Sequence, residues 1–188
     1  ARFDIPVVAV TGSNGKTIVK EWLYQLLRQD KNIVRSPKSY NSQTGVPISV
    51  WQMNSENKLA IFEAGISLPG EMQRLQHIID PDIGILTNIG QAHDENFGSL
   101  REKLVEKLKL FVQSKTLIYC KDLLLVSEVI TESNMLPKEV KLFTWSRKLK
   151  ADLQVGRITK SSHETEIQGI YQNDFLKISK QYNCTFDK

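Results

Sequence analysis

The chain has 188 residues, enough for one domain with its own hydrophobic core and too few for two full domains. Its 40% hydrophobic and 24% charged residues exclude a disordered chain, a collagen-like repeat and a coiled coil. The net charge of +4 does not indicate nucleic-acid binding, because the basic excess is scattered over the residues after 140.

Cysteine usage and hydropathy bear on the compartment of the protein. Cys120 and Cys184 have no metal-type spacing, which is typical of reduced thiols in the cytosol. No apolar run approaches the roughly 18 residues that a membrane span needs, and no signal-peptide apolar segment follows the first residues. We therefore expect a cytoplasmic protein with no membrane partner.

From Ile5 to about residue 145, short β-branched runs alternate with amphipathic stretches, a pattern typical of βαβ units around a parallel sheet. The first strand is expected at 6–10 and the first helix at 17–28. Further strands are expected at 32–35, 59–62, 83–87, 116–120 and 140–144. Helices are expected near 46–53, 70–79, 99–112 and 122–134.

The texture changes after Trp145, where the segments 153–159, 164–171 and 175–179 alternate or are β-branched. We interpret them as antiparallel strands added to one edge of the sheet. The predicted fold class is therefore α/β, with a mostly parallel sheet flanked by helices and an antiparallel β extension at the C-terminal end. Three tryptophans are expected to be core or packing residues and not a stacking platform: Trp22, Trp51 and Trp145.

A glycine-containing loop lies between the first strand and the first helix, where a phosphate-binding loop must lie: Thr11, Gly12, Ser13, Asn14, Gly15, Lys16 and Thr17. The two glycines allow backbone N–H groups to converge on phosphate oxygens, next to the positive end of the helix. Lys16 would meet the β and γ phosphates, and the Thr17 hydroxyl would bind Mg²⁺.

The match to the general P-loop pattern is partial, because Val10 stands where the pattern has glycine. The alternative is a strand-to-helix turn that happens to contain two glycines and a lysine. A nucleotide site is the favoured interpretation. GTP is disfavoured, because the only Asn-Lys pair, at 57–58, lacks the aspartate of a guanine-binding motif.

Glu63 follows the strand predicted at 59–62, so its carboxylate should reach the carboxyl edge of the parallel sheet, where ligands bind in such folds. The neighbouring phosphate loop favours a magnesium ligand over a solvent-facing carboxylate.

Lys107 falls within an apolar helical stripe formed by Leu100, Leu104, Leu108 and Phe111. An inward-facing lysine must pair with an acid, extend its amine to solvent or lose its charge.

The phosphate loop with its sequel Ile18, Val19, Lys20 and Glu21 resembles the Mur ligases, the ATP-dependent amide-forming enzymes of peptidoglycan precursor synthesis. Four further segments resemble the family in order and spacing: 40–47, 62–72, 86–93 and 106–111. Within the family, residues 19–21 and 88–98 are most similar to the branch that adds D-alanyl-D-alanine to UDP-N-acetylmuramoyl-tripeptide.

The resemblance implies that the chain is the central ATP-binding domain, with an α/β core at 1–145 and the β extension at 146–188. The UDP-binding domain before it and the C-terminal domain after it would lie outside the chain, so we expect this piece to be inactive alone. The resemblance also implies the reaction. The full-length protein would use ATP to phosphorylate the carboxylate of the UDP-linked peptide, and the incoming amine would then attack the acyl phosphate.

By the same resemblance, Lys107 becomes a carbamate, and this anion with His93 would hold a second Mg²⁺. Histidine is an atypical magnesium ligand, so a hydrogen-bonding role is the alternative for His93. The alternative for Lys107 is a lysine whose amine reaches solvent. Asn41 and Gln43 would lie near the γ-phosphate and the acceptor substrate. Lys16, Lys107 and His93 are thus the candidate catalytic residues.

Two rival functions remain open at this stage. A ligase similar to folylpolyglutamate synthetase would share the loop and the lysine but join glutamate to folate. A P-loop phosphotransferase, or a nucleotide-binding module without ligation, would need no amine acceptor.

Overall fold

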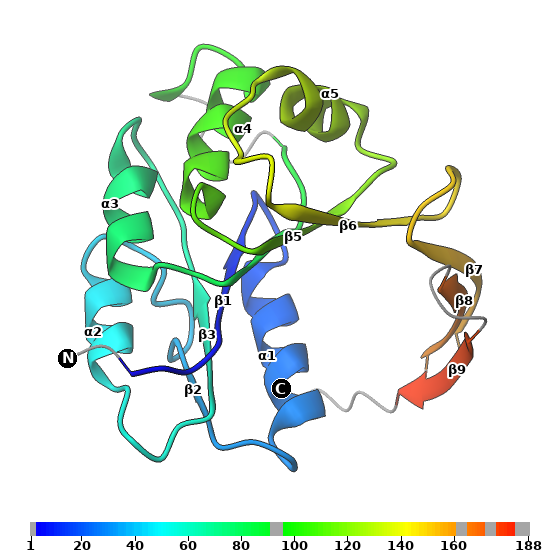
Figure 1. The fold of residues 1–188 in the computed structure, drawn as a ribbon, viewed down its shortest axis with the longest axis horizontal. Coiled ribbons are helices and arrows are strands. Elements are labelled where there is room, and N and C mark those ends of the chain that lie inside the picture. The colour runs from blue at the N-terminus through cyan, green and yellow to red at the C-terminus, as the bar shows by residue number, and fades with distance from the viewer. Residues whose placement is uncertain (1–2, 91–95, 161–164, 172–175, 183–188) are drawn as a thin grey trace.

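The computed structural model describes residues 3–90, 96–160, 165–171 and 176–182, and these form a sheet with helices packed against both faces (Figure 1). The strands are β1 Val7–Thr11, β2 Ile33–Arg35, β3 Leu59–Glu63, β4 Ile83–Leu86, β5 Thr116–Cys120, β6 Lys141–Ser146, β7 Leu153–Lys160, β8 Thr165–Tyr171 and β9 Leu176–Tyr182. The helices are α1 Lys16–Leu27, α2 Gly45–Trp51, α3 Glu71–Ile79, α4 Leu100–Leu108, the 3₁₀ turn η2 Lys109–Phe111 and α5 Leu124–Glu132.

The strand order is β2-β3-β1-β4-β5-β6-β7-β8-β9, and the pairings from β2 to β6 are all parallel. In the centre, Val10 of β1 lies beside Glu63 of β3, and Thr11 lies beside Leu86 of β4. The carboxyl ends of these three strands therefore meet at one edge, where ligands bind in doubly wound sheets.

The alternation of side chains along the strands separates two apolar cores. On one face Val8 and Val10 pack with Ile61 against the partly buried Val19 and Leu23 of α1. The other face carries the larger core, to which the remaining helices contribute Val46, Met72, Leu75, Leu104, Leu108, Val126 and Val129. Figure 1 shows α1 on one side of the sheet and α2 to α5 on the other.

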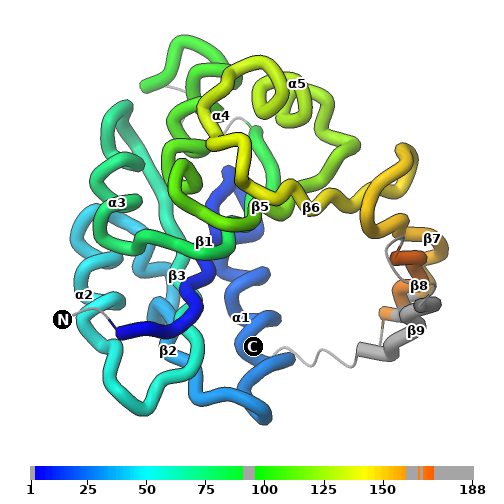
Figure 2. The backbone as a smooth tube through the Cα atoms, in the orientation of Figure 1, coloured from blue at the N-terminus to red at the C-terminus, as the bar shows by residue number. Residues whose placement is uncertain are grey.

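The last three strands form a ribbon, of which β7 and β8 stand apart from the helices in the tube view (Figure 2). β7 joins β6 by a short parallel pairing, with Trp145 beside Leu153 and Ser146 beside Gln154. It then pairs antiparallel with β8, which pairs antiparallel with β9. The rings of Phe143 and Tyr171 stack with their centroids 5.8 Å apart and tie the ribbon to the sheet.

The predicted fold class is confirmed, including the antiparallel extension, and the predicted strands are present with shifted ends. The parallel pairing that joins β7 to β6 was not predicted. The expectation that Trp51 is a packing residue is wrong, because 88% of it is exposed at the end of α2. Within the described residues, no helix is long and apolar enough to cross a membrane.

Candidate active site

The loop between β1 and α1 adopts the shape of an anion-binding turn. Gly15 precedes α1 with a φ of 80°, a conformation that suits glycine, and no side chain caps the helix there. The first N–H groups of α1 are therefore left for a ligand, next to the positive end of the helix dipole. Lys16 and Thr17 are the first two residues of the helix.

The segment after β4 holds this loop from one side. Asn88 accepts a hydrogen bond from Ser13 N through its carbonyl oxygen and one from Asn14 N through Oδ1, both at 3.0 Å. Thr87 Oγ1 donates to Asn14 O at 2.7 Å, and the Ser13 hydroxyl bonds to both the N–H and the carbonyl of Gly90. The loop shape is thus fixed by contacts within the protein.

The phosphate loop approaches the segment after β4 so closely that only glycine fits at position 12. A Cβ at this position would collide with Thr87 Oγ1 and would lie 2.9 Å from the Asn88 carbonyl oxygen. Any side chain here would push the phosphate loop away from the segment after β4.

The side chain of Lys16 folds back over the loop. Its amine donates to Gly12 O at 3.1 Å and to Ser13 O at 3.4 Å. Burial lowers the pKa of Lys16, Glu63 opposes that shift, and Lys103 adds to it. The amine lies where it can turn toward a phosphate held at the start of α1.

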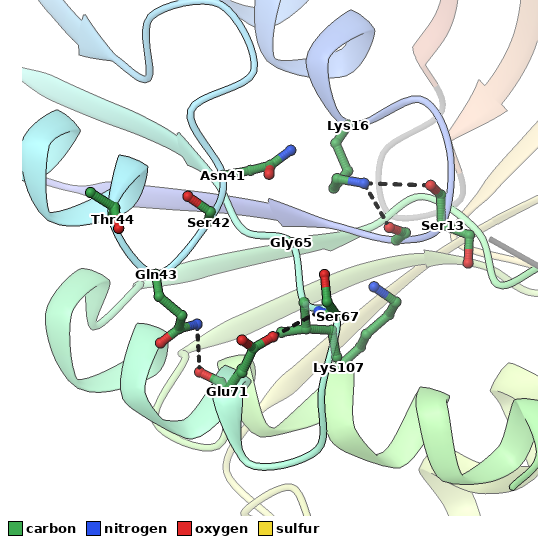
Figure 3. A pocket seen from close by; sticks show the side chains of 12 residues that line it. Ser13, Lys16, Asn41, Ser42, Gln43, Thr44, Gly65, Ser67, Glu71 and Lys107 are labelled. Carbon is green, nitrogen blue, oxygen red and sulfur yellow. Dashed lines mark hydrogen bonds between the residues drawn. The ribbon is translucent and has the colours of Figure 1, made fainter. Parts of the chain in front are cut away.

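A cavity of about 230 Å³ opens beside the loop (Figure 3). It is lined by the phosphate loop, the segment after β2, the segment after β3 and one residue each of α3 and α4. Of the predicted residues, Gly12, Ser13, Lys16, Asn41, Gln43 and Lys107 line it. The structure therefore brings together residues that lie up to 95 positions apart in the sequence.

Lys107 is 3% exposed, as the apolar stripe predicted, and its amine points toward the phosphate loop in Figure 3. No hydrogen bond joins this amine to the other cavity-lining residues drawn in Figure 3. Burial, together with the positive charges of Lys16 and Lys103, lowers the pKa of Lys107 to about 7. Near pH 7, the Lys107 amine is therefore neutral in a large fraction of the molecules.

Glu63 ends β3 and is fully buried. Its Oε1 accepts a hydrogen bond from Asn41 Nδ2 at 2.7 Å, whereas Oε2 accepts none among the described residues. Asn41 is itself held by Gly65, whose N–H donates to Asn41 O at 2.7 Å. A buried carboxylate oxygen without a donor fits a cation ligand, because Mg²⁺ prefers oxygen.

The described residues contain no cluster of three or more His, Cys, Asp or Glu side chains that could hold a metal ion. A magnesium ion near Glu63 would therefore need other oxygens, such as the Thr17 hydroxyl and phosphate. His93 lies outside the described residues, so its predicted role stays a prediction.

Sequence reasoning missed several residues of the site. Ser67 and Glu71 line the cavity after β3, where Glu71 Oε2 accepts hydrogen bonds from the N–H groups of Ser67 and Leu68 at 2.7 and 2.9 Å. Lys103 is 2% exposed and donates to Gly90 O at 2.6 Å. Lys103 precedes Lys107 by four residues, about one helical turn, and so lies on the same face of α4. The helical spacing that placed Lys107 inside could therefore also have identified Lys103.

Comparison with known proteins settles the family. The family described as the Mur ligase middle domain matches residues 10–185. The chain belongs to the Mur ligase family. The resemblance drawn from the sequence motifs is thereby confirmed.

Curated relatives and solved structures agree with this assignment. The chain is 40% identical over 103 residues to the UDP-N-acetylmuramoyl-tripeptide–D-alanyl-D-alanine ligase of Borreliella burgdorferi, covering 55% of this chain and 22% of that protein. It is 29% identical over 182 residues to the Bacillus subtilis ligase of the same name, covering 94% of this chain and 38% of the relative.

Among solved structures, the MurF ligase of Thermotoga maritima in complex with ADP is 25% identical and superposes with a TM-score of 0.79. The match covers 94% of this chain and 40% of that structure. The chain thus spans well under half the length of these relatives.

Proposed function

We propose that this chain is the ATP-binding domain of a ligase that joins D-alanyl-D-alanine to UDP-N-acetylmuramoyl-tripeptide in peptidoglycan precursor synthesis. The observation that carries the proposal is the cavity in which the phosphate loop, Asn41 and Lys107 meet. Relatives over this region carry that activity in their names, and a structural neighbour binds ADP.

In the proposed reaction, the γ-phosphoryl group of ATP passes to the peptide carboxylate and ADP is released. The amine of the dipeptide then attacks the acyl carbon, and phosphate leaves as the amine loses a proton. Catalysis of such a transfer depends mainly on positioning and on stabilisation of charge. The unpaired N–H groups at the start of α1 and the amine of Lys16 would provide both.

Magnesium bound at this site would neutralise phosphate oxygens, and the residues that would hold it are Thr17 and Glu63. The Oε2 atom of Glu63, which accepts no hydrogen bond from the described residues, supports this assignment. Asn41 would keep the carboxylate oriented through its hydrogen bond to Oε1. Gln43, whose side chain donates to Glu71 O at 3.1 Å, would line the place of the acceptor substrate.

We further propose that Lys107 is carbamoylated. Its neutral amine adds to the carbon of CO₂, and the proton leaves to solvent, so a buried cation becomes an anion with two oxygens. The pKa of about 7 supports this step, because only the neutral amine reacts. With His93, the carbamate would hold a second Mg²⁺ near the positive charges of Lys16 and Lys103, which act on Lys107.

The complete enzyme would include the domains that the resemblance implies on either side, and it would act in the cytoplasm.

The test is phosphate release from Mg-ATP by the full-length protein with UDP-N-acetylmuramoyl-tripeptide and one of several acceptors. Release that needs D-alanyl-D-alanine, and not D-alanine or glutamate, is expected.

Release with no acceptor, or only with folate and glutamate, would overturn the proposal. Lys16→Ala should lower the rate by at least about 100-fold, because removing one charge-stabilising donor typically costs 10²–10³. An unchanged rate in this variant would contradict the role of the phosphate loop.

A further inference from the structure

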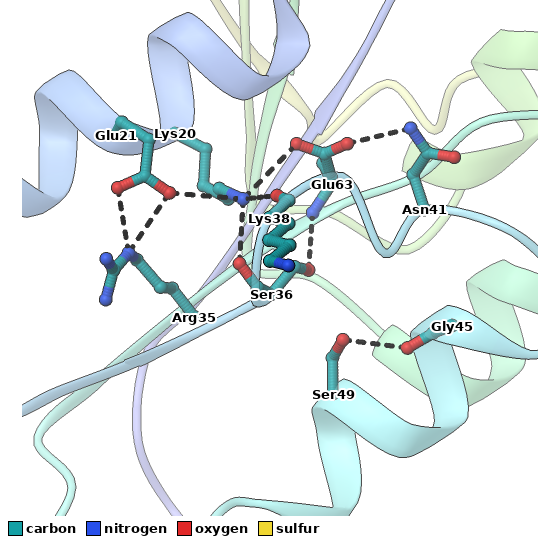
Figure 4. Close-up of polar contacts among 9 residues, drawn as sticks. All are labelled: Lys20, Glu21, Arg35, Ser36, Lys38, Asn41, Gly45, Ser49 and Glu63. Atoms are coloured by element: carbon teal, nitrogen blue, oxygen red, sulfur yellow. Dashed lines mark hydrogen bonds and ion pairs between the residues drawn. The ribbon is translucent and has the colours of Figure 1, made fainter. Parts of the chain in front are cut away.

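A second buried lysine lies beside the site. The side chain of Lys20 is 0% exposed and extends from α1 toward the ends of β2 and β3 (Figure 4). Its amine donates to Ser36 O at 2.7 Å and also to Lys38 O. It lies 3.3 Å from Glu21 Oε1 and 3.5 Å from Glu63 Oε2.

The contact with Glu63 is an ion pair and not a hydrogen bond. The Oε2 atom accepts no hydrogen bond from the described residues, although the Lys20 charge is only 3.5 Å away. Its lone pairs therefore stay available to a cation, while part of the negative charge is already compensated.

Glu21 competes with Glu63 for the same amine. Its carboxylate is 30% exposed and also pairs with Arg35, with Nε and Oε2 3.0 Å apart. Charges thus alternate along Arg35, Glu21, Lys20 and Glu63, as Figure 4 shows. Weakening the ion pair between Lys20 and Glu21 should therefore strengthen the ion pair between Lys20 and Glu63.

Lys20 also fixes the segment that carries Asn41. Lys38 has a positive φ of 48°, which is uncommon for a residue with a side chain, and its carbonyl accepts a hydrogen bond from Lys20. Ser36 adds a second link, because its hydroxyl accepts a hydrogen bond from Glu63 N at 3.2 Å. The same amine therefore positions the carboxylate and the segment after β2.

We propose that Lys20 is a positioning residue that sets the affinity of the Glu63 carboxylate for a divalent cation. The inference rests on the proposed role of Glu63 as a metal ligand. With Lys20 in place, the protein binds the cation weakly by itself. The phosphates of a bound nucleotide supply the missing negative charge, so cation and nucleotide bind cooperatively.

The test is Mn²⁺ binding to the full-length protein, measured by electron paramagnetic resonance with and without ADP. Lys20→Met should raise the Mn²⁺ affinity without ADP about tenfold, because Glu63 loses its counter-charge. Glu21→Gln should lower it about threefold, because Lys20 then pairs with Glu63 alone. In the wild type, ADP should raise the Mn²⁺ affinity more than in Lys20→Met.

Two controls separate the possible failures. Lys31→Met removes an exposed lysine and should leave Mn²⁺ binding unchanged. If Glu63→Gln does not weaken Mn²⁺ binding, the proposed metal role of Glu63 is wrong. If Glu63→Gln abolishes binding and neither Lys20→Met nor Glu21→Gln changes the affinity, Lys20 has only a structural role.

Lys20→Met can fail to fold, which circular dichroism would show. Glu21→Gln then decides the question, because this side chain is partly exposed and its replacement leaves both Lys20 and Glu63 in the protein. An unchanged affinity in Glu21→Gln would overturn the inference, and a decrease would support it.

Discussion

Two buried lysines at the same edge of the sheet have opposite surroundings. Lys20 is 0% exposed and has two carbonyl acceptors and two carboxylates within 3.5 Å. Lys107 is 3% exposed, and the charges that act on it are those of Lys16 and Lys103. Acceptors and carboxylates compensate the charge of a buried amine, whereas burial among other cations lowers the pKa of Lys107.

Because their surroundings differ, Lys20 and Lys107 have different roles. Lys20 can hold neighbouring groups in place because its own contacts are satisfied. Lys107 can react because its amine has no hydrogen bond to the cavity-lining residues drawn in Figure 3, and its pKa of about 7 leaves a neutral nucleophile. Burial alone therefore does not identify a reactive lysine; the partners do.

The largest effect is expected from Lys20→Met. Removing one member of a buried ion pair leaves its carboxylate partner uncompensated, which typically costs about 3–5 kcal/mol. Urea unfolding should show this loss in the free energy of unfolding. A change below about 1 kcal/mol would mean that the Lys20 contacts contribute little net stability.

Lys107→Ala should remove most of the ligase activity while leaving the fold intact. We expect a loss of about 100-fold or more in phosphate release, the size seen when one group that stabilises charge is removed. Added short carboxylates should restore part of the rate by replacing the carbamate. Lys109→Ala is the matched control, because Lys109 is 36% exposed and does not line the cavity; its buried partner Glu106 keeps its hydrogen bonds from Gly70 N and Met72 N.

If Lys107→Ala retains the wild-type rate, the carbamate proposal is wrong. A loss that carboxylates do not rescue would argue for a direct contact of the amine with substrate.

The stability of Lys107→Met should depend on pH. The folded pKa of about 7 lies below the unfolded value of 10.5, so the unfolded chain binds more protons between these pH values. The buried charge therefore destabilises the wild type fully below pH 7, and the penalty fades as the pH rises toward 10.5.

Lys107→Met should accordingly be more stable than the wild type at pH 6, by more than about 1 kcal/mol, the equivalent of one pKa unit. The advantage should shrink between pH 7 and 9, as measured by urea unfolding in apo protein without bicarbonate. A difference that is constant over this pH range would show that Lys107 does not titrate there.

The smallest effect is expected from Asn88→Ala, which removes a neutral contact at the same edge. Its Oδ1 accepts the Asn14 N–H at 3.0 Å, and such hydrogen bonds contribute about 0.5–1.5 kcal/mol. ADP affinity should fall about twofold to tenfold by calorimetry. Asn88→Asp keeps the acceptor but adds negative charge near the phosphates, so it should weaken ADP binding further.

Much of this account could be predicted from the sequence. The β-branched runs predicted the parallel strands, and the apolar stripe placed Lys107 inside, because local periodicity reports burial. Lys20 could not be recognised in this way. Its partners Ser36 and Lys38 follow β2 and its partner Glu63 ends β3, and only the fold brings these two parts of the chain to α1.

Other features lay beyond pattern analysis for related reasons. Trp51 is the last residue of α2 and is exposed, although its side chain is apolar. The residue type alone therefore did not predict its exposure. The parallel start of β7 depends on the path of residues 147–152 between β6 and β7, which period-2 alternation does not encode.

The most direct test of the contrast between the two lysines is carbon-13 NMR of the full-length protein with labelled bicarbonate. We predict a carbamate resonance near neutral pH that is lost in Lys107→Ala and retained in a folded Lys20 variant such as Lys20→Arg. A spectrum without this resonance between pH 6 and 9, or one in which it persists in Lys107→Ala, would contradict the account.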